Sequence, residues 1–155
     1  MLVRTHRVSD IPGISRLYYD TIHHINCHDY TREQVDAWAP AVPDVAFWKE
    51  RFKKYRVYVA EEDSHIVGFT ELAATGHIDC FFVHHEWQRR GVGTRLMGRL
   101  MATAGKEKML RLFAEVSITA VPFFRDREFV VLRENETIRR NVKLKQFAME
   151  RWLMT

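Results

Sequence analysis

Apolar residues near the start of the chain first alternate and then recur at helical steps. Val3 and Val8 flank alternating polar residues, which predicts a short strand over residues 2–8. Ser9-Asp10 can cap a following helix, and Pro12 is tolerated in its first turn. The buried face of that helix is predicted from residues spaced three and four apart: Ile11, Ile14, Leu17, Tyr18, Ile22 and Ile25.

A second, shorter helix is predicted just after residue 30. Thr31 followed three residues later by Gln34 is typical of a capping box, and the helix should run through Val35 and Trp38 until Pro40 ends it. One or two further helical turns are indicated by Phe47, Trp48 and Phe52.

The middle of the chain changes to β-type patterning. Residues 56–60 and 66–72 are β-rich runs on either side of the polar turn 61–64, so they predict a hairpin. Residues 78–83 are apolar at nearly every position, which is typical of a strand in the centre of a sheet.

The last third alternates between helix and strand. Helical spacing runs from Val92 to Ala104, and Gly105 stands where a helix end often needs a left-handed residue. Further elements are expected at 110–116 (strand), 118–127 (short helix), 129–132 and 142–153 (strands). The order βααβββαβαββ predicts an α/β fold in one domain, residues 1–155, with about seven strands flanked by about four helices.

Composition places the chain among globular domains. Of 155 residues, 46% are hydrophobic and 28% charged. No apolar run approaches the roughly 18 residues of a membrane span, and the first residues lack a signal-peptide core, so we expect a cytoplasmic protein without a membrane partner. Two cysteines, Cys27 and Cys80, make a disulfide framework improbable. The formal charge of +4 suits an anionic ligand such as a phosphate-rich cofactor.

A glycine-containing loop, residues 88–94, links the apolar strand to the amphipathic helix. Such a connection directs backbone N–H groups and the positive end of the helix dipole to one point, where phosphate oxygens can bind. Gly91 and Gly93 allow close backbone approach. The dinucleotide fingerprint is excluded because Leu96 stands where a third glycine is needed, and the sequence lacks the Gly-Lys-Ser/Thr of NTPase phosphate loops.

On these residues the chain resembles the GNAT N-acetyltransferases, whose signature is Gln/Arg-x-x-Gly-x-Gly/Ala between the fourth strand and the third helix. The predicted element order is similar over almost the full chain, and Val116-Ser117 with residues 120–124 looks like the family's fifth strand and fourth helix. The resemblance implies a mostly antiparallel sheet in which two strands splay apart to admit the pantetheine arm. It also implies acetyl-CoA as co-substrate, no metal, and direct attack by a primary amine in a ternary complex.

The resemblance further implies which residues hold the cofactor. Backbone groups of Phe82 and Val83 would bond the pantetheine amides and the acetyl carbonyl, while Ser117, Phe123 and Phe124 would border the thiol arm. The pyrophosphate loop supplies the remaining cofactor-binding residues: Gln88, Arg89, Arg90, Gly91, Val92, Gly93 and Thr94.

Two positions depart from the family pattern. Phe124 stands where the family often has a tyrosine that protonates the departing thiolate, and phenylalanine has no proton to give. Glu128 stands where a glycine usually precedes the aromatic residue of the sixth strand, which suggests a remodelled turn.

Three residues are candidates for the base that deprotonates the amine. His77 and Asp79 share one face of the central strand, and Glu71 lies on the preceding strand. His77 matches a position where some family members carry a glutamate, and its ordinary pKa of about 6.5 suits proton transfer near neutral pH. The helices that roof the acceptor cleft in this family carry candidate substrate residues: Tyr18, Tyr30 and Trp38.

Other interpretations of the sequence remain open. His24, Cys27 and His28 lie within one helical turn and could bind zinc, although a further ligand would be needed. Arg139-Arg140 suggests weak nucleic-acid contact, but no specific nucleic-acid partner is expected. A fold of this family could also bind acyl-CoA as a non-catalytic sensor. We expect a small-molecule amine as acceptor, with a protein or peptide amine as the alternative, and the exposed late strands could form a homodimer.

Overall fold

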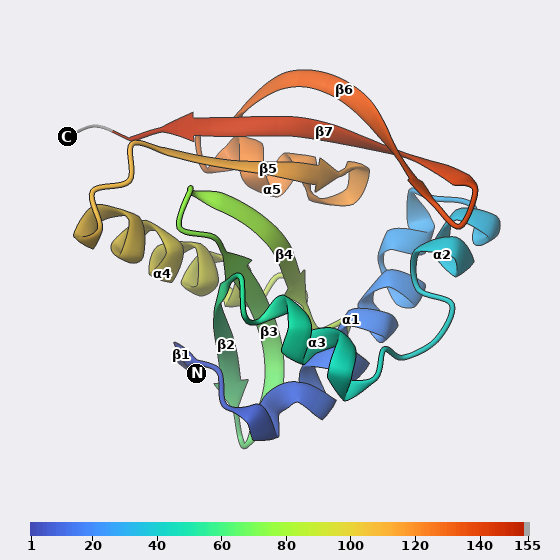
Figure 1. Ribbon diagram of the computed structural model, residues 1–155, viewed down its shortest axis with the longest axis horizontal. Coiled ribbons are helices and arrows are strands. Elements are labelled where there is room, and N and C mark those ends of the chain that lie inside the picture. Colours follow the sequence, from blue (N-terminus) through green and yellow to red (C-terminus); the bar gives the residue numbers. More distant parts are fainter. Residues whose placement is uncertain (154–155) are drawn as a thin grey trace.

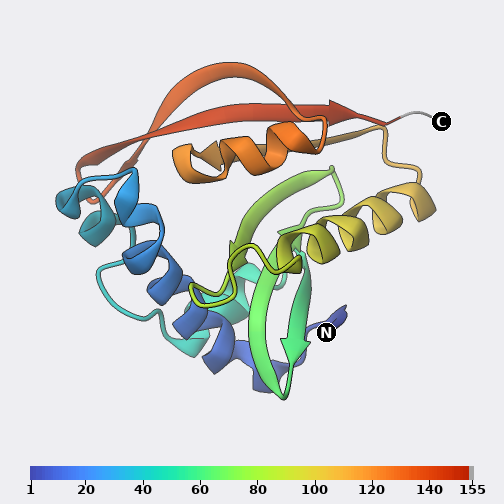
Figure 2. The same ribbon diagram turned by 180° about the vertical axis from the view of Figure 1, so that it is seen from behind.

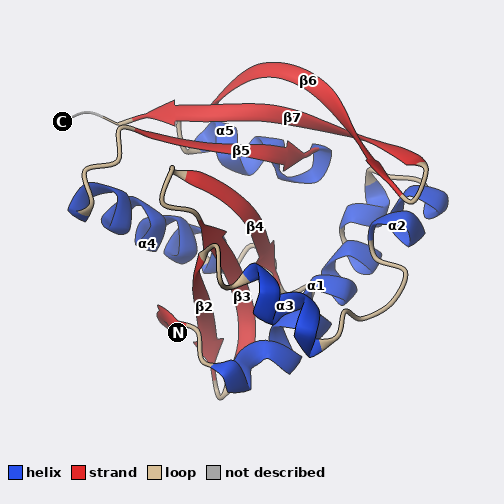
Figure 3. Ribbon diagram, viewed as in Figure 1, coloured by secondary structure: helices blue, strands red, loops and turns tan. Residues whose placement is uncertain are grey.

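The computed structural model describes residues 1–153, which form a mixed sheet in the order β1-β2-β3-β4-β5-β7-β6 (Figure 1). Figure 3 distinguishes the strands from the helices. The strands are β1 (Leu2–Thr5), β2 (Arg56–Glu62), β3 (His65–Leu72), β4 (His77–Val83), β5 (Arg111–Ser117), β6 (Val130–Arg139) and β7 (Val142–Trp152). The helices are α1 (Ile11–His24), α2 (Arg32–Trp38), α3 (Val45–Arg51), α4 (Val92–Lys106) and α5 (Val121–Asp126).

Strand pairing breaks down between β4 and β5. Neighbouring strands pair antiparallel except these two, which run parallel. Within residues 1–153 they share two residue pairs, His77 with Phe113 and Ile78 with Ala114. Beyond Ile78, β4 stays paired with β3 on its other edge, where Phe82 lies opposite Phe69. β4 therefore bends away from β5 (Figure 1), and the mixed, mostly antiparallel sheet with two splayed strands is confirmed.

Helices cover both faces of the sheet. Three of them, α1, α2 and α3, build a core on one face around the fully buried Trp48 and Phe69. On the other face α4 and α5 pack around Leu100, Leu112 and Phe129. Seen from behind, α4 and α5 lie in front of the strands (Figure 2). This layering follows from strands whose alternate apolar side chains point to opposite faces.

The first strand ends earlier than predicted. It stops at Thr5 rather than residue 8, because the Asp10 carboxylate accepts hydrogen bonds from the Arg7 backbone N–H (2.7 Å) and the Arg4 guanidinium (2.8 Å) and so closes a tight turn. The Arg4 guanidinium also lowers the pKa of Asp10. The helix that follows is confirmed, with Pro12 in its first turn.

The helical region before the hairpin contains one element more than the predicted order. The capping box of α2 is confirmed, since Thr31 Oγ1 accepts from the Gln34 N–H at 3.1 Å. A separate helix, α3, begins after Asp44, whose side chain accepts from the Phe47 N–H at 2.9 Å. The sequence pattern indicated one or two helical turns here, which the predicted order did not count as a separate helix.

The end of α4 also differs from the prediction. The helix continues through Gly105 to Lys106, and Lys108 takes the left-handed conformation with φ of 57°. The glycine is therefore an ordinary helical residue here.

Candidate active site

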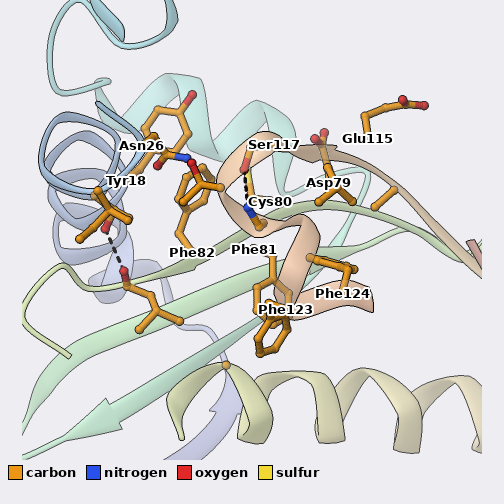
Figure 4. A pocket seen from close by; sticks show the side chains of 18 of the residues that line it. Tyr18, Asn26, Asp79, Cys80, Phe81, Phe82, Glu115, Ser117, Phe123 and Phe124 are labelled. Atoms are coloured by element: carbon orange, nitrogen blue, oxygen red, sulfur yellow. Dashed lines mark hydrogen bonds between the residues drawn. The ribbon is translucent and has the colours of Figure 1, made fainter. Parts of the chain in front are cut away.

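The opening between β4 and β5 widens into a cleft of about 920 Å³. Adjacent β4 residues point to different walls, so Phe81 packs against Phe123 of α5 while Phe82 packs edge-on against Tyr18 of α1, with ring centroids 5.1 Å apart. Figure 4 shows these residues around the cleft, together with Ser117 at the end of β5. The cleft thus joins elements from both faces of the sheet.

The glycine loop enters α4 through left-handed backbone. Gly91 has a φ of 83° and precedes the first residue of α4, and Arg89 has a φ of 59°. A side chain at Gly91 would meet open space, so the glycine is needed for its backbone angle and not for room. Because α4 is 15 residues long, its N–H groups and dipole favour an anion here.

The other loop glycine brings α5 against the loop. A Cβ on Gly93 would lie 2.8 Å from the Phe123 ring, so no larger residue fits without movement. Arg127 stacks on that ring, 3.6 Å from its centroid, and donates to Thr94 Oγ1 at 2.5 Å. Arg127 was missed by sequence reasoning, because nothing local links it to a loop 33 residues away.

Side chains of the loop shape the turn. Gln88 Nε2 donates to the backbone oxygens of Val83 (2.8 Å) and His84 (3.3 Å). The Val83 oxygen also accepts from Thr21 Oγ1 of α1 at 3.0 Å. The Arg90 guanidinium lies 4.9 Å from the centre of the Trp87 ring. Gln88 therefore fixes the strand end, and the Val83 carbonyl is already occupied.

The three candidate bases differ in what surrounds them. Glu71 is fully buried, and Arg51 of α3 binds both its oxygens, at 2.6 and 3.2 Å. Arg51 also donates to Asp79 at 2.6 Å. His77 lies at the start of β4 with its ring 5.1 Å from that of Phe113, and it lines the cleft as Asp79 does. Both carboxylates are thus bound to one guanidinium, whereas the imidazole is held by ring packing.

Arg51 also occupies the centre of one group of metal-ligating side chains. Glu71, Asp79 and Cys80 come together here, and Arg51 contacts both carboxylates and lies 3.8 Å from Cys80 Sγ. Burial raises the pKa of the Cys80 thiol. The positive charge among these three side chains is therefore the Arg51 guanidinium.

The histidines at the end of α1 serve local contacts. His23 Nε2 bonds to the Ala39 oxygen (2.6 Å) and His24 Nδ1 to the Asp20 oxygen (2.7 Å), while Cys27 is exposed. Within the described part of the chain, no helix has the length and apolarity needed to cross a membrane.

The predicted substrate residues all line the cleft. Tyr30 serves as a strut, since its hydroxyl donates to the Lys145 oxygen at 2.7 Å and accepts from the Ile118 N–H at 2.9 Å. Trp38 packs edge-on against Tyr30, and its ring centroid lies 6.3 Å from that of Phe82. These rings form an aromatic wall of the cleft.

The two positions that depart from the family pattern, Phe124 and Glu128, each have a defined conformation in the structure. Phe124 is 2% exposed and packs against Phe81 and Phe129, so it contributes only apolar surface. Ser117 Oγ accepts from the Ala120 N–H at 3.2 Å and caps the turn that leads into α5. Glu128 has a left-handed φ of 69°, a conformation in which glycine is favoured.

Comparison with known proteins identifies the fold and the family. The acetyltransferase (GNAT) domain profile matches residues 26–151. The chain belongs to the GNAT acetyltransferase family. It is 28% identical to the uncharacterised N-acetyltransferase YafP of Escherichia coli K12, over 95% of this chain and 93% of the relative.

Solved GNAT structures superpose closely. A GCN5-related N-acetyltransferase from Rhodopseudomonas palustris has 29% identity and a TM-score of 0.93, covering 98% of this chain and 95% of the other. The yncA protein of Salmonella typhimurium, solved with its cofactor acetyl-CoA, shares the fold at 19% identity, with a TM-score of 0.73 over 100% and 95% of the two chains. This GNAT protein is accordingly an acetyl-CoA-dependent N-acetyltransferase.

Proposed function

We propose that this acetyltransferase moves the acetyl group to a primary amine of a small molecule, by direct attack in a ternary complex. The observation that carries the proposal is one continuous cleft of about 920 Å³, which runs from the start of α4 to side chains of α1, α2 and α3. A cofactor arm and an acceptor can occupy such a cleft together, and attack then needs no acetylated enzyme intermediate.

The cofactor is expected to bind mainly through backbone groups. The left-handed residues Arg89 and Gly91 aim the loop amides at one point for the pyrophosphate. The edge of β4 that lacks a strand partner offers backbone groups around Phe82 to the pantetheine arm. Phe123 and Phe124 would border that arm from α5, and Ser117 from the end of β5.

His77 is the base that this geometry favours. Glu71 and Asp79 both accept hydrogen bonds from the Arg51 guanidinium, so their oxygens are already engaged. His77 lines the same cleft, and an imidazole is the side chain that most often serves as a general base. It would act on the amine directly or through one water.

Calorimetry and thiol release test the proposal together. Acetyl-CoA binding is measured first, and free coenzyme A is then detected across a panel of small amines, amino acids and a lysine peptide. We expect binding, and thiol release with at least one small amine. Release with the peptide alone would favour the protein-amine alternative, and binding without release from any amine would contradict the proposal.

A further inference from the structure

Tyr18 and Tyr30 both line the cleft, but their hydroxyls are used differently. The Tyr30 proton is committed to the Lys145 oxygen. The Trp38 indole, which can only donate a hydrogen bond, favours the charged form of Tyr18 and so weakly opposes the rise of its pKa. Among residues 1–153, the hydrogen bonds of the structure include no acceptor for the Tyr18 proton. Tyr18 thus keeps one donor for a ligand in the cleft.

The Tyr18 side chain is held rigidly in place. It is 7% exposed, and its ring packs edge-on against Phe82 and Trp48 with centroids 5.1 and 5.2 Å away. Burial raises the pKa of Tyr18 to about 12, an effect opposed by Arg139 and Arg51 and reinforced by Cys80. The hydroxyl therefore stays protonated near neutral pH, and Tyr18 lines the cleft from α1.

We propose that Tyr18 is the catalytic proton donor to the departing thiolate of coenzyme A, in place of the tyrosine that this chain lacks at position 124. The inference rests on the proposed function, in which backbone groups around Phe82 hold the thioester. The Tyr18 ring packs edge-on against the Phe82 side chain, so Tyr18 lies against the same segment of β4. Phe124 lies on the α5 side and has no proton to give.

The step balances without another reactant. The amine nitrogen bonds to the acetyl carbonyl carbon, the carbon–sulfur bond breaks, and its electron pair stays on sulfur. Sulfur takes the Tyr18 proton, and the Tyr18 oxygen regains one from water in the cleft. The amine releases its proton to the base, which returns it to solvent. In sum, one proton passes from the amine to coenzyme A.

The test does not require knowledge of the acceptor. Coenzyme A is bound to the protein, and the pKa of its thiol is read from the ultraviolet absorbance of the thiolate. A donated hydrogen bond stabilises the thiolate, so Tyr18→Phe should raise that pKa by about one unit. Tyr19→Phe is the matched control, because Tyr19 stacks on His23 and lies outside the cleft lining; it should leave the thiol pKa unchanged.

The outcomes separate the two proposals. Normal coenzyme A affinity of Tyr18→Phe with an unchanged thiol pKa would overturn the role of Tyr18 alone. Failure of the wild-type protein to bind coenzyme A would overturn the proposed function, and this inference with it. With an amine that is acetylated, Tyr18→Phe should lower kcat about 10- to 100-fold and leave KM for the amine within about twofold. A change in KM alone would mean that Tyr18 binds the acceptor instead.

Discussion

In the proposed function, the two ends of the cleft recognise their ligands by different means. At the cofactor end, the loop before α4 offers main-chain amides, set by left-handed angles at Arg89 and Gly91. At the acceptor end, the lining is made of side chains from separate elements, with Arg51 joined to Glu71 and Asp79. Backbone recognition tolerates many sequences, whereas the acceptor end depends on each side chain. Backbone recognition of the cofactor can therefore be common to proteins of this fold, whereas the side chains at the acceptor end are particular to this chain.

The severest test of the acceptor end is Arg51→Met. The change leaves the fully buried Glu71 carboxylate without its cation, which should lower the free energy of unfolding by about 3–5 kcal/mol. Urea denaturation measures the loss. Lys49→Met, at an exposed position of the same helix, should change stability by less than about 0.5 kcal/mol. Adding Glu71→Gln to Arg51→Met should recover part of the loss, and no recovery would contradict the ion-pair explanation.

The corresponding test of the cofactor end is Gly91→Glu. A glutamate must adopt the left-handed φ of 83° and brings negative charge to the amides, so affinity for acetyl-CoA should fall about 100-fold or more, about 2.7 kcal/mol. Gly98→Glu is the matched control, because Gly98 lies on the exposed side of α4 with open space around it. Equal affinities of the two variants in calorimetry would show that the loop does not hold the pyrophosphate.

The sequence predicted the glycine loop better than it predicted the acceptor end of the cleft. The loop was predictable because backbone geometry leaves a local signature, glycines between a strand and a helix. The acceptor end was not, because Arg51 and Glu71 lie 20 residues apart and meet only once α3 packs beside β3. Glu71 was predicted as a base from its strand position alone, which gives no sign of its buried cation. Arg127 was missed for the same reason, since its contact with Thr94 depends on how α5 docks.

A substitution with a smaller expected effect tests whether backbone groups contribute most of the binding at the cofactor end. Arg90→Ala removes a charge that stacks on Trp87 at the rim, so acetyl-CoA affinity should fall by about threefold or less. Calorimetry at low and moderate salt measures the effect. A loss above about tenfold would mean that this side chain, and not the main chain, carries much of the binding.

The smallest expected effect concerns the turn between α5 and β6. Glu128→Gly removes the strain of a left-handed φ of 69°, which stabilises the folded state, and it also gives the unfolded chain more freedom, which opposes this. We expect the first effect to be the larger, so the free energy of unfolding should rise by about 0.5–1 kcal/mol. The ion pair of Glu128 with the half-buried Arg151 should matter little, because the glutamate carboxylate is well exposed. Thermal unfolding checks this, and acetyl-CoA affinity should stay the same. A loss of stability would mean that the remodelled turn needs its glutamate.

The short parallel contact between β4 and β5 has a consequence for the protein in the cell. Within the described chain β4 and β5 share two residue pairs, so a molecule bound between these strands helps to hold the two parts of the sheet together. With the cofactor placed there as proposed, resistance to unfolding would track the supply of acetyl-CoA, gaining about 2.7 kcal/mol when the cofactor is at 100 times its dissociation constant. Metabolic state would in this way set how long the protein survives proteolysis, independently of catalysis.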